Sequence, residues 1–280
     1  MADHQEVEEL PASMNIAELV PSLDGDGWKS GLRKFLHRLL GLYEIHRVFS
    51  AASEAENKGT KNLFSNVLNE LRMSMDLDDL RQKIPPVGPL VVVANHPFGG
   101  CDAVALSGVC MEMRPDTKVL ANAMAADLPG ADRWLIPLLI MGEQGSTGIN
   151  RQAMKETLEH LRAGGLLVVF PAGAVSRWRN DLGRIADPEW SPHIVRLAAK
   201  TNAQILPVRF FGKNPLWFEL LGNIHPLLRS AFIIRVFLNM KGKNICFRAG
   251  NLIEPSDLIP ETPAEETTKM VRDAVESIDM

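Results

Sequence analysis

The residues with the clearest capacity for chemistry are His96 and Asp102, which lie on either side of a glycine pair. The apolar residues 91–94 lead directly into this turn. A carboxylate can accept a proton from one imidazole nitrogen, fix the tautomer and leave the other nitrogen free as a general base. Gly99 and Gly100 would let the backbone curl so that Asp102 returns towards His96. The sequence therefore predicts a site that deprotonates a hydroxyl group, the alternative being a structural histidine after a buried strand.

A second polar loop follows another apolar segment further along the chain. Residues 166–170 are apolar, and Pro171-Ala172-Gly173-Ala174-Val175-Ser176-Arg177 comes directly after them. In open α/β sheets, ligands bind where strands end and loops begin. Two loops of this design at one sheet edge would form a site.

Two arginines are candidates for binding an anion. Arg151 follows Asn150, which is predicted to cap the start of a helix, so Arg151 would lie in the first turn. Helix amides and a guanidinium together suit a phosphate or a carboxylate. Arg177 would supply a second cation. For both arginines the alternative is a solvated surface side chain.

Several other catalytic motifs do not occur in the sequence. It contains no G-x-S-x-G, G-x-x-x-x-G-K-[ST], G-x-G-x-x-G or H-E-x-x-H pattern. Cys101, Cys110 and Cys246 lack C-x-x-C spacing, which disfavours a disulfide framework and a zinc site and favours a reducing compartment. Cys101 is predicted to be a packing residue at a helix start and not a nucleophile. No bound cofactor or metal is expected.

The composition limits the class of protein. The chain has 280 residues, of which 46% are hydrophobic, and this is ample for a buried core. A net charge of -4 disfavours generic nucleic-acid binding. Residues 1–9 lack the pattern of a secretory signal, and no segment reaches the roughly 18 to 20 apolar residues that a membrane span requires. We therefore expect a cytoplasmic protein that can lie on a membrane surface without crossing it.

The sequence predicts three segments. Residues 1–27 carry turn-forming residues and are predicted to form a loosely held arm. Residues 28–84 are predicted to be helical, with a basic amphipathic helix over 28–49, a candidate bend at Gly41 and a second helix over 61–75. The basic helix either packs on the core or lies at a membrane interface, with its cations near anionic headgroups. Prolines in residues 84–89 mark the start of the main domain, 85–280.

In the main domain, short apolar runs alternate with helical patterns. Strands are predicted at residues 90–94, 118–121, 166–170, 204–210 and 245–248, and helices at 102–113, 150–162, 192–201 and from 263 onward. This alternation indicates an α/β fold, for which we expect a single mixed sheet flanked by helices.

The residues around His96 also carry a family resemblance. Asn95-His96-Pro97-Phe98-Gly99-Gly100-Cys101-Asp102 resembles the H-x-x-x-x-D block of the glycerolipid and lysophospholipid acyltransferases. Residues 148–151, 170–177 and 205–208 resemble the second, third and fourth blocks of that family, in the same order. Residues 184–190 and 211–214 are similar to a bacterial branch that includes haemolysin-like proteins and lyso-ornithine-lipid-type O-acyltransferases. The resemblance covers roughly residues 30–255.

The sequence departs from the family pattern in two ways. Five residues separate His96 from Asp102 where the main family has four, although the bacterial branch also has five. The third block of the family carries a glutamate that helps to hold the acceptor, at the position of Ala172 or, in the bacterial branch, of Ala174. Both positions are alanine here. The resemblance thus leaves open whether acceptor binding is rearranged, altered or impaired.

The resemblance implies an O-acyltransferase of lipid biosynthesis. It would move a fatty acyl group from a thioester on acyl carrier protein or coenzyme A to the hydroxyl of a lyso-lipid, either a lyso-aminolipid such as lyso-ornithine lipid or a lysophospholipid. His96 would be the base and Asp102 its partner. The acceptor, the oxyanion or the donor phosphate would be bound by Asn95, Gly99, Gly100, Arg151, Gly173, Ser176 and Arg177.

Such an enzyme would act as a peripheral protein on the inner face of the cytoplasmic membrane. The apolar run 134–140 would then dock on the membrane, line an acyl tunnel or pack in the core. Two alternatives to the enzyme stay open: a non-catalytic lipid-binding protein of the same fold, which the two alanines favour, and a thioesterase that uses water in place of the lipid hydroxyl.

Overall fold

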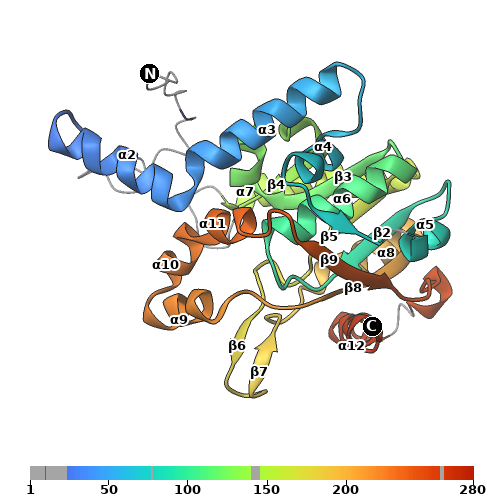
Figure 1. Cartoon of the computed structure of the whole chain (residues 1–280). Helices are drawn as coiled ribbons and strands as arrows, with labels where there is room; N and C mark the ends of the chain where they lie inside the picture. The colour runs from blue at the N-terminus through green and yellow to red at the C-terminus, as the bar shows by residue number, and fades with distance from the viewer. Residues whose placement is uncertain (1–9, 11–23, 77, 140–145, 259–261) are drawn as a thin grey trace.

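A mixed sheet of seven strands forms the centre of the molecule (Figure 1). The computed structural model describes residues 10, 24–76, 78–139, 146–258 and 262–280. The strand order is β1-β9-β8-β2-β5-β3-β4. The strands are β1 (Ser74–Met75), β2 (Leu90–Ala94), β3 (Thr117–Asn122), β4 (Leu135–Leu138), β5 (Leu166–Val169), β8 (Gln204–Phe211) and β9 (Asn244–Ala249). The predicted α/β fold with a single mixed central sheet is confirmed.

The strands that carry the predicted site are neighbours at the middle of the sheet. Strand β2 pairs in parallel with β5 on one side and with β8 on the other, while β9 runs antiparallel to β8. All five residues of β2 are buried, because helices cover both faces of the sheet. The carboxyl ends of β5, β2 and β8 therefore lie side by side.

Two layers of helices cover the sheet. Successive residues of β2 point to opposite faces of the sheet, so that Val92 belongs to one apolar core and Val91 to a second. The first core receives α3 (Leu42–Asn57), α4 (Leu63–Glu70), α6 (Gly100–Met113) and α11 (Ile233–Leu238). The second receives α7 (Ser146–Arg162), α8 (His193–Thr201) and α12 (Ala264–Glu276). The helices α3 and α4, from the segment 28–84, thus share a core with the sheet.

The predicted helix over 28–49 is two helices in the structure. Helix α2 (Trp28–Leu40) ends at Gly41, which has a φ of 81°, and α3 begins directly afterwards. A Cβ at Gly41 would lie 2.5 Å from Leu238 Cδ1, so both the backbone angle and the close approach of α11 favour glycine. The candidate bend at Gly41 is confirmed.

Several predicted boundaries are wrong. The helix expected over 61–75 is only α4, because Ser74 and Met75 pair with β9 as strand β1. The apolar run after Trp134 forms the edge strand β4 with Leu135 and Ile136 buried, and Ile140 lies outside the described residues. Sequence analysis also missed the following elements: α5 (Asp78–Lys83), β6 (Arg177–Arg179), β7 (Arg184–Ala186), α9 (Leu216–Ile224), α10 (Pro226–Ala231) and α11.

The three-segment division stays a prediction. Most of the arm predicted over 1–27 lies outside the described residues. Within the described part of the chain, no helix has both the length and the hydropathy needed to cross a membrane.

Candidate active site

His96 and Asp102 meet at the sheet edge where β2 ends. His96 follows β2 by two residues, and Asp102 lies in the first turn of α6. His96 Nδ1 lies 3.2 Å from Asp102 Oδ2, although the angle is too bent for a well-directed hydrogen bond. Catalytic hydrogen bonds are often poorly aligned before substrate binds. Because Nδ1 is buried beside the carboxylate, Nε2 is the nitrogen that can meet a substrate.

The Asp102 carboxylate is fully buried. Its Oδ2 also accepts hydrogen bonds from the backbone N–H groups of Phe98 and Gly99, at 2.8 and 3.0 Å. Its Oδ1 is buried and has no partner among the described residues. Burial raises the pKa of Asp102, while His96 and the two amides act in the opposite direction. This carboxylate therefore fixes the turn around His96.

The glycine pair has two different roles in this turn. Gly99 has a φ of 80°, and a Cβ there would lie 2.9 Å from Ile233 Cδ1 and 3.0 Å from Val175 Cγ2. Gly100 begins α6, and a Cβ there would be 3.7 Å from Phe237, which is an ordinary contact.

We expect Gly99→Ala to lower the free energy of unfolding by about 1 to 3 kcal/mol, because alanine would be strained at this backbone angle. Gly100→Ala is the matched control and should leave stability within about 1 kcal/mol, since its backbone is helical. Thermal unfolding of the two variants checks this prediction. Equal effects would show that the backbone angle of Gly99 does not matter.

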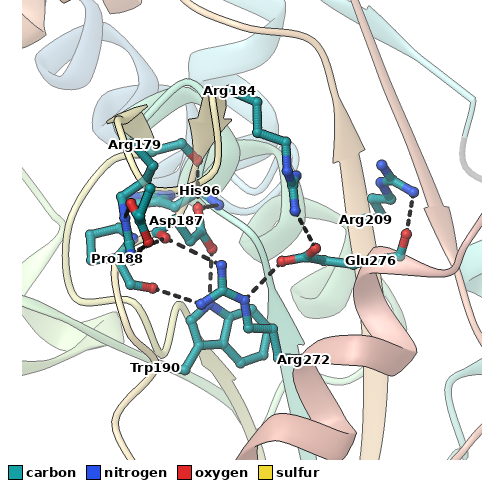
Figure 2. A network of polar contacts seen from close by, with 11 residues as sticks. His96, Arg179, Arg184, Asp187, Pro188, Trp190, Arg209, Arg272 and Glu276 are labelled. Atoms are coloured by element: carbon teal, nitrogen blue, oxygen red, sulfur yellow. Dashed lines mark hydrogen bonds and ion pairs between the residues drawn. The ribbon is translucent and has the colours of Figure 1, made fainter.

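A buried carboxylate holds the backbone of His96 from the other side (Figure 2). Asp187 Oδ1 accepts the N–H of His96 at 3.1 Å and the hydroxyl of Ser176 at 2.5 Å, and its Oδ2 accepts the indole N–H of Trp190 at 2.9 Å. The carbonyl of His96 accepts the N–H of Ser176 at 2.9 Å. Both backbone groups of His96 are therefore fixed, and Asp187 joins the turn at His96, the loop at Ser176 and the segment at Trp190.

An outer set of charged groups fixes the loop of Asp187. The carbonyl of Asp187 accepts hydrogen bonds from Arg179 and Arg272, at 3.4 and 3.3 Å. In Figure 2, Glu276 lies between Arg272 and Arg184, which contact its two carboxylate oxygens at 2.8 and 2.7 Å. Helix α12 thereby anchors the loop that positions His96.

The end of β8 holds the turn of His96 on a third side. The side chain of Asn95 donates to the carbonyl of Phe210 and accepts from its N–H, at 2.9 and 2.7 Å. Asn214 donates to the carbonyl of Pro97 at 2.8 Å. A Cβ at Gly212 would lie 2.3 Å from the ring of Phe98, so only glycine fits there without movement. These contacts show an anchoring role for Asn95, and its predicted role in substrate binding stays a prediction.

The structure places the loop 170–177 against the His96 turn. The ring of Phe170 packs on His96 with their centroids 4.2 Å apart. Gly173 has a φ of 63° and open space around its Cα, while Ala174 is exposed and Ala172 packs on the second core. Arg177 begins β6 and is exposed. The binding roles of Gly173, Ser176 and Arg177 stay predictions.

The predicted helix cap at Asn150 is wrong. Helix α7 already includes Ser146, so Asn150 lies inside the helix and Arg151 lies in its second turn, beyond the free amides. The Asn150 side chain instead accepts from the N–H of Leu139 and donates to its carbonyl, at 2.8 and 2.9 Å. Arg151 is exposed. Its anion-binding role stays a prediction that rests on its guanidinium alone.

Arg229, which was not predicted from the sequence, lies next to the loop 170–177. Arg229 donates to the carbonyls of Val175 and Ser176 and lies 3.3 Å from the carboxylate of Glu219. Burial lowers the pKa of Arg229, and Glu219 opposes this effect. No local pattern in the sequence indicates this contact, because Arg229 is 53 residues from Ser176.

A cavity of about 630 Å³ lies beside these loops. Asn95, Pro97, Ser176 and Asp187 contribute to its wall, together with Arg209 and Glu219. The side chain of His96 is not among the described residues that line it. The cavity therefore adjoins the turn of His96 on the side of Asp187.

Within the described part of the chain, no group of three His, Cys, Asp or Glu side chains is placed to hold a metal ion. Cys101 is buried, and burial raises the pKa of its thiol. This agrees with the predicted packing role of Cys101.

Comparisons with known proteins give a matching family and two similar relatives. A sequence model of the Acyltransferase family matches residues 62–254. The chain is 28% identical over 208 residues to a lyso-glycine lipid O-acyltransferase of Phocaeicola vulgatus, covering 72% of this chain and 71% of that protein. It is 30% identical over 155 residues to a lyso-glycine lipid O-acyltransferase of Bacteroides thetaiotaomicron, covering 55% and 54%.

One solved structure is similar to this chain over most of its length, at low sequence identity. This is the 1-acyl-sn-glycerophosphate acyltransferase PlsC of Thermotoga maritima, with a TM-score of 0.49 and 18% identity. The match covers 87% of this chain and 94% of that one.

Proposed function

The chain belongs to the acyltransferase family, and we propose that it transfers a fatty acyl group from a thioester to the hydroxyl of a lyso-lipid. The observation that carries this proposal is the contact of His96 with the buried Asp102 at the joined ends of β5, β2 and β8. The names of the relatives support a lyso-lipid as acceptor.

In the proposed reaction, His96 Nε2 removes the proton of the lipid hydroxyl as its oxygen attacks the thioester carbonyl. Asp102 stabilises the imidazolium that forms. The tetrahedral intermediate then collapses, the C–S bond breaks, and the imidazolium returns its proton to the leaving thiolate. An ester and a free thiol are produced, and no acyl-enzyme is required.

We propose a lyso-aminolipid as the acceptor, with a lysophospholipid as the second candidate. Both relatives are named for lyso-glycine lipid, which supports a lyso-aminolipid as the acceptor class. These names do not favour lyso-ornithine lipid over other lyso-aminolipids. Arg151 and Arg177 would bind an anionic group of the acceptor or of the donor. The donor would be an acyl thioester of acyl carrier protein or of coenzyme A.

The test is to incubate the purified protein with each acyl donor and a panel of lyso-lipids, and to identify the products by mass. A diacylated product together with thiol release supports the proposal. Thiol release that needs no lyso-lipid would identify a thioesterase. Lyso-lipid binding without thiol release would identify a lipid-binding protein.

We propose that the protein works as a peripheral protein on the inner face of the cytoplasmic membrane, with α2 at the interface. Its outer face exposes Trp28, Leu32, Phe35 and Leu39, and Lys29, Lys34 and Arg38 are interspersed. Figure 1 shows α2 extending away from the sheet. Apolar side chains can enter the acyl region while the cations contact anionic headgroups.

We expect the double variant Trp28→Ala, Phe35→Ala to bind anionic vesicles more weakly, since each cation or large apolar group at the surface contributes on the order of 1 kcal/mol or more. Sedimentation with liposomes measures this. Undiminished binding would assign α2 a role other than membrane contact.

A further inference from the structure

Helix α9 presents an apolar stripe to solvent beside the catalytic turn. Leu216, Leu220 and Ile224 recur every fourth residue and are 69%, 60% and 72% exposed. Trp217, on the neighbouring position, is 39% exposed. A contiguous exposed stripe of large apolar side chains on one helix marks a contact with another apolar phase or partner.

The stripe is a property of a firmly packed helix. Phe218 of the same helix is fully buried, and Arg229 lies 4.8 Å above its ring. The acidic residue of α9, Glu219, is turned inward to Arg229 at 3.3 Å. The outward face of α9 therefore carries no charge, whereas the inward face is held by packing and an ion pair.

Cations and a further aromatic side chain flank this stripe. Lys213 lies just before α9 and is exposed, as is Arg177 on β6. Strand β6 contacts α9, and its Trp178 is 49% exposed. An apolar stripe with cations and tryptophan at its borders is complementary to an anionic bilayer surface.

The position of α9 is fixed relative to His96. Asn214, two residues before the helix, donates to the carbonyl of Pro97. On α10, the helix that follows α9, Arg229 donates to the carbonyls of Val175 and Ser176. A surface that contacts α9 would therefore lie next to both loops of the candidate active site.

Helix α9 also lies in one row of helices with α2. Helix α9 contacts α10, α10 contacts α11, and α11 contacts α2. Figure 1 shows these helices following one another along one side of the molecule. The exposed side chains of α2 and α9 thus lie at the two ends of one row of helices.

We propose that the α9 stripe is a second membrane-docking element, which contacts an anionic bilayer and brings the lipid surface to the His96 turn. This inference rests on the proposed lipid function and extends it to a surface of its own. The uncharged outward face favours acyl chains over an acidic protein such as acyl carrier protein, which would contact the cations and leave the stripe exposed to water.

The test uses the full chain with the double variant Leu220→Glu, Ile224→Glu. The matched control is Val87→Glu, Met270→Glu, which adds the same charge at apolar residues that are also exposed but lie before β2 and on α12. Binding to phosphatidylglycerol vesicles is measured by sedimentation, with phosphatidylcholine vesicles in parallel. We expect at least tenfold weaker binding to the anionic vesicles for the α9 variant and unchanged binding for the control.

Activity provides a second readout. For this readout the single variant Ile224→Glu is used, because Leu220 borders the cavity beside Asp187 whereas Ile224 is not among the described residues that line it. On a short-chain lyso-lipid below its micellar concentration, Ile224→Glu should keep its turnover, whereas on lyso-lipid in vesicles its turnover should fall. Unchanged vesicle binding would overturn the proposal. The proposal would also be overturned if the α9 variant lost only self-association, measured by sedimentation velocity, or only the binding of acyl carrier protein. Vesicle binding is measured without any reaction, so failure of the acyltransferase function and failure of this proposal remain distinguishable.

Discussion

Replacing His96 by alanine is expected to reduce acyl transfer by about 100-fold to 10,000-fold, because this is the usual contribution of a general base. The ring is the group in the described structure that Asp102 orients, with Nδ1 at 3.2 Å from Oδ2. The backbone contacts of residue 96 to Asp187 and Ser176 do not involve the ring. The turn should therefore persist in the variant.

The measurement is the rate of diacyl-lipid formation, with thermal unfolding in parallel. Loss of the ring contact with Phe170 should cost about 1 kcal/mol of stability. The control is His193→Ala, at an exposed histidine at the start of α8. Retained turnover in His96→Ala would remove this residue from the reaction, whereas equal loss in both variants would point to a general effect of histidine removal.

Asp187→Asn is the second change with a large expected effect. The carboxylate accepts three hydrogen bonds, and an amide can accept at only one of its two atoms. Its NH₂ group would face a donor, either the indole of Trp190 or the pair at His96 and Ser176. We expect a loss of about 1 to 3 kcal/mol in stability. We also expect a fall in kcat on the order of 100-fold, because small misplacements of a catalytic group have effects of this size.

Two further variants separate positioning from stability. Trp190→Phe removes the donor to Oδ2 but leaves the N–H of His96 bound to Oδ1, so its kcat should fall less even where its stability falls equally. Asp132→Asn, at an exposed carboxylate just before the edge strand β4, is the control. The positioning role predicts a change in kcat with little change in the KM for lyso-lipid, at a temperature where every variant is folded. A kcat that tracks stability alone across the three variants would contradict it.

The local features of the fold followed from sequence because their causes are local. Strand β2 was predicted to the residue, since five consecutive apolar residues are bounded by prolines and a polar turn. The end of α2 at Gly41 was also predicted. Helix α9 was missed although its outer face is apolar at every fourth residue. Both faces of this short helix carry large apolar side chains, which weakens the amphipathic pattern that marks a surface helix.

Asn150 shows where local reasoning failed. Its residue type favours a helix cap, but its side chain pairs with the backbone of Leu139 while α7 begins earlier. Residues 11 positions apart in the chain thus overrode a local preference.

The sequence by itself determined the α/β class and the pair His96 and Asp102, because the two residues lie on one short turn and need only glycine between them to meet. The tertiary structure decided what holds that turn in place. Asp187 is 91 residues from His96, Asn214 is 117 residues from Pro97, and Arg229 is 53 residues from Ser176. These contacts exist because parallel strands bring the ends of β5, β2 and β8 together, and no local pattern of residue types encodes which distant side chains will meet there.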